Sequence, residues 1–283
     1  LLFNCFGVIG LVLLYVKYLD VLKKNKINYF LLLSIIFLPS MSFWSSAPGK
    51  DALSFLIVSF CLFTLSKKYY YIYVPFSSFL MFIIRPHIGV VFFISFFIVF
   101  IFKIKVNFYY KIGFVFINIL IIYFSLNYVL TSISFNNMLT LDGITQFIEN
   151  RERSSYIGGT KIDLFDSNFF EKIYHYLFTP SLINYNGDSL IFLILSFENT
   201  FLLMIILIMS TKVIINISKS KFRIKDILEF ENLFILLLSF TLLIVLSHTT
   251  FNSGIATRQK YIFLPLILYL MFKLSINKKN DNL

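Results

Sequence analysis

The sequence LPSMSFWSSAPGKD at residues 38–51 interrupts two strongly apolar runs and decides how the chain around it can fold. Each of the flanking runs is close to the length of a membrane-spanning helix. A polar turn between two such helices must lie at a membrane face or line a protected cavity, because lipid offers its peptide groups no hydrogen-bond partner. We therefore expect Trp44 at interfacial depth, with Lys50 and Asp51 at the start of the second helix, where Asp51 can cap free N–H groups.

Composition predicts the class of protein. Hydrophobic residues make up 58% of the 283 residues, charged residues make up 14%, and 37 residues are phenylalanine. A soluble domain of this size could not bury so much apolar surface, so we expect an all-α, polytopic transmembrane helix bundle that forms one integral membrane domain. The net charge of +11 then reflects basic cytoplasmic loops and does not indicate a nucleic-acid partner. Cys5 and Cys61 fall in apolar runs, which argues against a disulfide and against a metal site.

A helix needs about 20 apolar residues to cross a bilayer. By that measure the sequence predicts about nine spans, at residues 1–16, 27–44, 52–66, 69–84, 88–102, 112–131, 190–210, 227–247 and 261–275. The chain starts with leucine inside an apolar run, so we expect it to lack one or more N-terminal helices of a longer protein.

The loops between these spans alternate in charge. One set holds 17 of the 25 basic residues and includes the C-terminus, so the excess of positive charge assigns this set to the cytoplasm. The other set holds four of the five arginines, and arginine suits fork-like binding of phosphate or carboxylate. Function is therefore expected on the outer face. The long loop at 132–189 is also predicted to face outward and to carry short helices at 137–150 and 168–178.

Arg85-Pro86-His87 divides the apolar segment 69–102, whose 34 residues must cross the membrane twice. At 1.5 Å per residue the segment covers about 51 Å, less than the roughly 60 Å that two crossings need. The turn is therefore expected to dip below the outer surface. Arg85 then either extends its charge to the lipid headgroups or faces a water-filled cavity that accepts an anion, and the helix break at Pro86 favours the cavity.

Two further features of the sequence have alternative interpretations. Arg151-Glu152-Arg153 is either a solvated helix end or a site for a diphosphate. Glu198, expected near the middle of the span 190–210, makes a structural hydrogen bond between helices or serves as a general base with a pKa raised by burial. Arg258 is expected where the last helix begins.

No Walker loop, His-Glu-x-x-His motif or Asp-x-Asp motif occurs in the sequence, so an enzyme of this kind is expected to work without a bound metal. Six segments in this order resemble bacterial O-antigen or capsular polysaccharide polymerases of the Wzy and EpsG-like kind. They are PSMSFWSSAPGKDAL (39–53), IIRPHIGVVF (83–92), RERSSYIGG (151–159), YLFTPS (176–181), LSFEN (195–199) and FNSGIATRQK (251–260).

The resemblance implies a glycosyltransferase of the bacterial inner (cytoplasmic) membrane. Such an enzyme joins polyprenyl-diphosphate-linked oligosaccharide repeat units into O-antigen, capsule or exopolysaccharide on the outer face. It implies no cofactor and no nucleotide sugar. Expected partners are the lipid-linked oligosaccharide, membrane lipid, and a chain-length regulator and flippase of the same pathway.

Residue roles follow from this chemistry. Transfer from a polyprenyl diphosphate leaves an ionised diphosphate that fixed cations can stabilise, and the candidates are Lys50, Arg85, Arg151, Arg153 and Arg258. The attacking sugar hydroxyl needs a base, and the candidates are Glu198 and Asp51, followed by Glu152 and His248. The candidates for sugar binding are Trp44, His87 and Asn252.

Three other functions stay open. A flippase or transporter for the same lipid-linked sugars would also bind a diphosphate, but it would add nothing to substrate supplied on the outer face. A GT-C-type transferase would add one sugar from a polyprenyl monophosphate instead of building a ladder. A non-catalytic scaffold of an export complex would tolerate removal of the outer-face charges.

Overall fold

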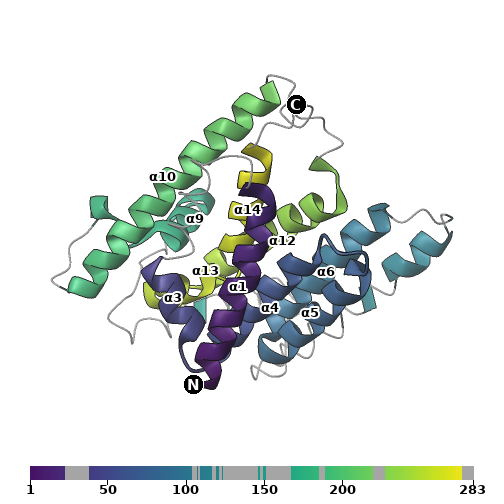
Figure 1. Ribbon diagram of the computed structural model, residues 1–283, viewed down its shortest axis with the longest axis horizontal. Coiled ribbons are helices and arrows are strands. Elements are labelled where there is room, and N and C mark those ends of the chain that lie inside the picture. Colours follow the sequence, from purple (N-terminus) through teal and green to yellow (C-terminus); the bar gives the residue numbers. More distant parts are fainter. Residues whose placement is uncertain are drawn as a thin grey trace.

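The computed structural model describes residues 1–22, 38–103, 107, 109–116, 119–120, 123, 146, 149–150, 167–184, 189–218 and 227–275. Every element within these ranges is helical, which confirms the predicted all-α class (Figure 1). The elements are α1 (Leu2–Leu22), α3 (Pro39–Ser46), α4 (Lys50–Thr64), α5 (Tyr70–Ile84), α6 (Pro86–Lys103), α9 (Phe169–Phe178), η1 (Leu182–Asn184), α10 (Leu190–Ser218), α12 (Phe230–Thr249), α13 (Ser253–Lys260) and α14 (Leu264–Ser275).

Four helices among the described residues, α1, α6, α10 and α12, are long and apolar enough to cross a membrane. A fifth candidate is α3 together with α4, although the chain bends by 108° between them. Helices α5 and α14 are apolar but shorter. The count of nine spans is therefore not confirmed. The predicted spans at 27–44 and 112–131, like most of the predicted loop 132–189, lie largely outside the described residues.

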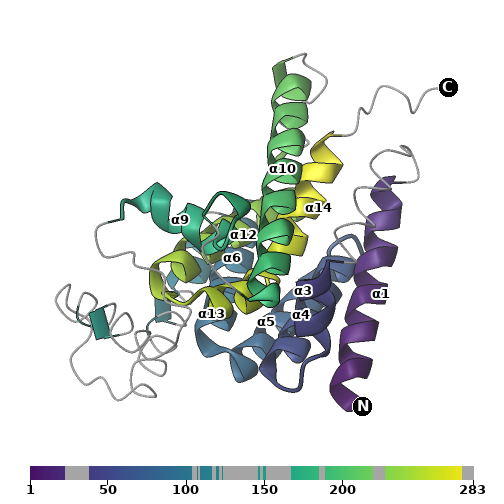
Figure 2. The ribbon, with the colours of Figure 1, turned by 90° about the vertical axis from the view of Figure 1, so that its left-hand side faces the viewer.

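The helices form one bundle. Helix α1 lies along α3 and α4, α4 to α6 pack in chain order, and α12 packs between α6 and α14. Helix α10 runs beside α14, and α9 packs across α12, α10 and α13 (Figure 2). The amphipathic helix predicted at 168–178 is confirmed by α9, which begins with a capping box between Asn168 and Glu171.

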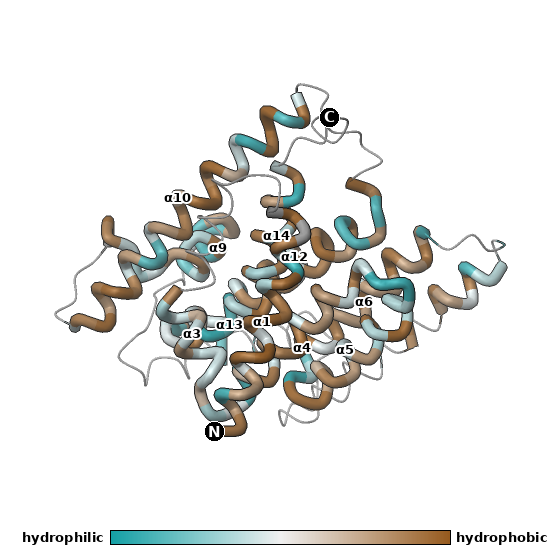
Figure 3. Tube along the Cα trace, in the orientation of Figure 1, coloured by the Kyte–Doolittle hydropathy of each residue, from teal (hydrophilic) through white to brown (hydrophobic). Residues whose placement is uncertain are grey.

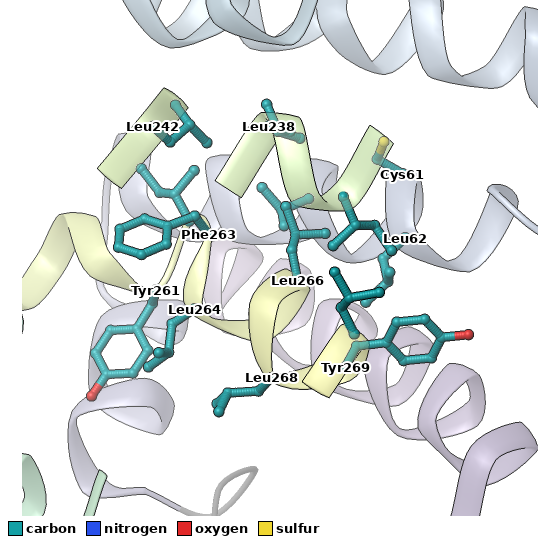
Figure 4. Packing of buried hydrophobic residues seen from close by; sticks show 14 of the residues in the cluster. Cys61, Leu62, Leu238, Leu242, Tyr261, Phe263, Leu264, Leu266, Leu268 and Tyr269 are labelled. Atoms are coloured by element: carbon teal, nitrogen blue, oxygen red, sulfur yellow. The ribbon is translucent and has the colours of Figure 1, made fainter. Parts of the chain in front are cut away.

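The core lies where α4, α12 and α14 meet. Figure 4 shows Cys61 and Leu62 of α4 facing Leu238 and Leu242 of α12, with Leu266 of α14 between them, and all five are fully buried. Most helices are coloured as hydrophobic in Figure 3, whereas the short α13 is paler. Apolar side chains also remain exposed on α1 and α10, a distribution typical of helices that contact lipid.

The two ends of α12 lie beside different polar groups. At its start, the Glu231 carboxylate forms ion pairs with buried Lys17 at 2.6 Å and with Lys273 at 2.9 Å. It also accepts a hydrogen bond of 3.1 Å from the Tyr269 hydroxyl. At its other end, the chain continues into α13, which carries Arg258. The 20 residues of α12 cover about 30 Å, the thickness of a bilayer's hydrocarbon core.

Helix α4 begins directly after a glycine. Gly49 has φ 129°, a conformation that favours residues without a Cβ, and it is the N-cap of α4. Lys50 and Asp51 therefore lie in the first turn, as predicted. The predicted capping by Asp51 is wrong, because no side chain caps α4. The Asp51 carboxylate is instead engaged by arginines.

The break at Pro86 is also as predicted. Helix α5 ends with Arg85 as its C-cap, and Pro86 starts α6. A Cβ on Gly89 would overlap the backbone of Phe82, so glycine permits the close approach of α5 and α6. The pair is a tight helical hairpin, with Arg85 in its turn.

Candidate functional site

Asp51 lies between two arginines from distant parts of the sequence. Arg85 donates from Nη2 to Oδ1 of Asp51, across 34 sequence positions. Arg258 approaches Oδ2 with Nη2 at 2.9 Å and with Nε at 3.1 Å, across 207 positions. The carboxylate thus joins α4, the α5–α6 turn and α13.

Trp44 completes this group, which we call the Asp51 cluster: Trp44, Asp51, Arg85 and Arg258. The Arg258 guanidinium carbon lies 5.1 Å from the centroid of the Trp44 ring, within reach of a cation–π interaction. The Arg258 side chain is 43% exposed, whereas those of Asp51 and Arg85 are each 10% exposed. The cluster therefore opens to the surface at Arg258 and is closed at Arg85. Arg258 lies in the last turn of α13, so its predicted place at a helix start is wrong.

The Asp51 cluster carries two positive charges against one negative charge. Burial lowers the pKa of Arg85 from its ordinary value, and the Asp51 carboxylate acts in the opposite direction. A half-buried site with one excess positive charge suits an anion that can accept several hydrogen bonds, such as a phosphate group. Within the described ranges no group of three His, Cys, Asp or Glu side chains could hold a metal ion.

A second, buried group surrounds Glu198, which lies in the first third of the 29-residue helix α10. Glu198 is 4% exposed. Its Oε2 accepts hydrogen bonds from Ser40 Oγ at 2.6 Å and from Ser40 N at 3.2 Å, and its Oε1 accepts one from the Tyr261 hydroxyl. These bonds join α10 to α3 and to the turn after α13. Of the two interpretations of Glu198, they favour the hydrogen bond between helices.

Lys260 belongs to the same region and is 1% exposed. Its ammonium donates to Asn199 Oδ1, and Asn199 Nδ2 donates to the Pro180 carbonyl at 2.7 Å. Burial lowers the pKa of Lys260 to about 8, while the Glu198 carboxylate acts in the opposite direction. The Glu198 group (Ser40, Glu198, Asn199, Lys260 and Tyr261) thus holds α3, α10 and α13 together.

The remaining predicted site residues are distributed differently. Half-buried His248 is in the last turn of α12, with Nδ1 2.9 Å from the Ile244 carbonyl oxygen and its ring 5.0 Å from that of Phe169. Asn252 caps α13, because its side-chain oxygen accepts from the backbone N–H groups of Gly254 and Ile255.

Two predicted residues are exposed at helix starts, Lys50 in α4 and His87 in α6. Arg151, Glu152 and Arg153 lie outside the described residues. The structure thus brings Trp44, Asp51, Arg85 and Arg258 into one cluster, which is the central part of the predicted site.

Sequence reasoning missed Lys260 and Tyr261 as site residues. Lys260 and Tyr261 come two and three residues after the predicted Arg258, and α13, which leads into them, had a readable signal in Asn252, a favourable N-cap residue.

Comparison of the chain with protein-family models, with curated proteins and with solved structures found no match.

Proposed function

We propose that the protein is a multi-pass membrane glycosyltransferase that polymerises polyprenyl-diphosphate-linked oligosaccharide repeat units on the outer face of a bacterial inner membrane. The observation that carries the proposal is the Asp51 carboxylate shared by Arg85 and Arg258. The same guanidinium groups can hold the oxygens of a diphosphate, and Trp44 beside them offers an aromatic face to a sugar.

The reaction uses the cluster as follows. Diphosphate oxygens take over the donors of Arg85 and Arg258, which releases the Asp51 carboxylate. The acceptor sugar's hydroxyl attacks the anomeric carbon and gives its proton to Asp51. The bond from that carbon to the diphosphate breaks, and the polyprenyl diphosphate leaves with the electron pair, stabilised by the two guanidinium groups.

The proposed membrane orientation has the Asp51 cluster outside and the Lys17–Glu231–Lys273 group inside, with the C-terminus cytoplasmic. The length of α12 between these two polar regions supports it. In a Cys5→Ser background we expect Lys50→Cys to react with a membrane-impermeant maleimide in intact spheroplasts. Lys68→Cys, in the turn between α4 and α5, should react only after permeabilisation. Both lysines are exposed, and equal labelling of the two in intact cells would contradict the orientation.

Deletion of the full-length gene in its native host tests the activity. We expect the ladder of surface polysaccharide on a gel to collapse to a single repeat unit, left on its carrier lipid, and wild-type complementation to restore it. An unchanged ladder would overturn the proposed function. One added sugar in place of a ladder would identify the single-sugar transferase instead.

A flippase for the same lipid-linked sugars is the second candidate. It is favoured by the fact that both oxygens of Asp51 and both oxygens of Glu198 already accept hydrogen bonds. A purely binding site needs no free base. Vesicles that contain the purified protein, with substrate supplied on the outer face, separate the two functions, because a polymerase elongates this substrate and a flippase leaves its length unchanged.

A further inference from the structure

Helix α9 packs against α13, the helix that carries Arg258 of the Asp51 cluster, and it contributes a buried hydroxyl. Tyr176 is 1% exposed, and its ring stacks on Phe263 with centroids 6.2 Å apart and planes at 21°. Its hydroxyl has no hydrogen-bond partner among the described residues. Burial raises the pKa of Tyr176 well above its ordinary value, and the positive charge of Arg85 acts in the opposite direction.

Arg85 has an unused donor as well. Its Nη2 is bound to Asp51, but its buried Nε–H has no partner within the described part of the chain. Buried donors are nearly always paired in folded proteins, since an unpaired one costs about 1–3 kcal/mol. Two such buried donors, one in the Asp51 cluster and one on the helix that packs against α13, indicate a place for an acceptor from outside the chain.

We propose that the Tyr176 hydroxyl and the Arg85 Nε–H are the inner donors of the diphosphate subsite and bind the oxygens of one phosphate group. The inference rests on the proposed function. It adds to that function a ligand-binding residue on α9, a helix from the segment that precedes α10. Arg258, which is more exposed, holds the outer phosphate group. A diphosphate ester thus satisfies both buried donors that the free protein leaves unpaired.

Tyr176→Phe is the direct test, because phenylalanine keeps the ring stacked on Phe263 and removes only the hydroxyl. The full-length protein in detergent is titrated with farnesyl diphosphate and, separately, with inorganic pyrophosphate. Loss of a hydrogen bond to a charged group should raise the Kd for both probes by roughly 10-fold or more. The matched control is Tyr174→Phe on the same helix, which should bind as the wild type does.

Thermal denaturation of the ligand-free protein separates binding from structure. Because the hydroxyl is unpaired in the free protein, Tyr176→Phe should have a Tm equal to or above that of the wild type, and only the ligand-induced rise in Tm should shrink. A lower ligand-free Tm would show that the hydroxyl has a structural partner and would overturn the inference.

The titrations also separate this inference from the proposed function. If the wild type binds farnesyl diphosphate and Tyr176→Phe binds it equally well, the role of Tyr176 is disproved and the proposed function stands. If the wild type binds neither probe, the role of Tyr176 and the proposed function are both disproved. If the wild type binds farnesyl diphosphate and pyrophosphate with equal affinity, and Tyr176→Phe binds both more weakly, the subsite is supported. Its ligand would then be a soluble diphosphate. Tighter binding of the farnesyl ester assigns it to a lipid-linked one.

Discussion

Replacing Arg85 with glutamine should abolish the polymer while the protein stays in the membrane. Arg85 supplies the buried guanidinium of the Asp51 cluster, where a fixed positive charge acts on the leaving diphosphate at low dielectric. Loss of one such group costs about 3 kcal/mol of transition-state stabilisation, so we expect at least a roughly 100-fold fall in product. The measurement is the polysaccharide ladder, set against the amount of protein in isolated membranes.

Folding must be controlled in this experiment, because Arg85→Gln leaves the half-buried Asp51 with one partner fewer. The double variant Asp51→Asn/Arg85→Gln removes that unbalanced charge, so it should be present at wild-type level and be equally inactive. Lys172→Met, a single-charge change on α9, should leave the ladder unchanged. Wild-type chain lengths from membrane-inserted Arg85→Gln would exclude Arg85 from diphosphate binding.

The largest effect on stability is expected from Glu198→Gln. This change removes a negative charge that stabilises the charged form of Lys260, whose buried ammonium donates to Asn199. Removing one partner of a buried charge pair typically costs about 3–5 kcal/mol, and we expect a loss of about 3 kcal/mol here because the amide can still accept from Ser40. Denaturation of the purified protein measures the loss. Glu229→Gln, at an exposed carboxylate near Lys273, should be nearly neutral.

The Glu198→Gln variant should also depend on pH in a defined direction. Without Glu198 the pKa of Lys260 falls below its value of about 8 in the wild type. The folded variant then binds fewer protons than its unfolded chain already below pH 8, so its stability should rise with pH in that range. Glu198→Gln/Lys260→Met removes the uncompensated charge and should recover most of the loss. A flat pH response, or no recovery in the double variant, would contradict the charge balance described here.

The sequence was sufficient to predict the apolar helices and the residues at which they break. Apolar runs near bilayer length predicted α1, α4, α5, α6, α10, α12 and α14, and Pro86 predicted the start of α6. These features are local, because they depend on residues within one or two helical turns. The same reasoning treated the residues of α13 as a polar loop, since an eight-residue helix of low hydropathy gives no membrane signal.

The contacts within the site depended on packing over long sequence separations. The sequence indicated outer-face arginines as candidates for binding a diphosphate, and two of them, Arg85 and Arg258, do meet at Asp51. It could not show that Asp51 would join them, because 207 positions separate Asp51 from Arg258. Glu198 illustrates the same limit. Its partners Ser40 and Tyr261 are 158 and 63 positions away, so its place in the bundle followed only from the packing of α3 against α10 and α13.

The length of α10 has a consequence for the surrounding lipid. Its 29 residues extend about 44 Å, against a hydrocarbon core of about 30 Å. Glu198 and Asn199 fix its first third, and near its end Asn216 donates to the carbonyls of Leu274 and Ser275 at 3.3 and 2.9 Å. A helix held by the bundle at both of these positions cannot slide to match bilayer thickness. Neighbouring acyl chains must therefore stretch or compress around it. The acyl-chain length of the surrounding lipid should therefore set the elastic strain on this protein, and that strain should act at the two ends of α10.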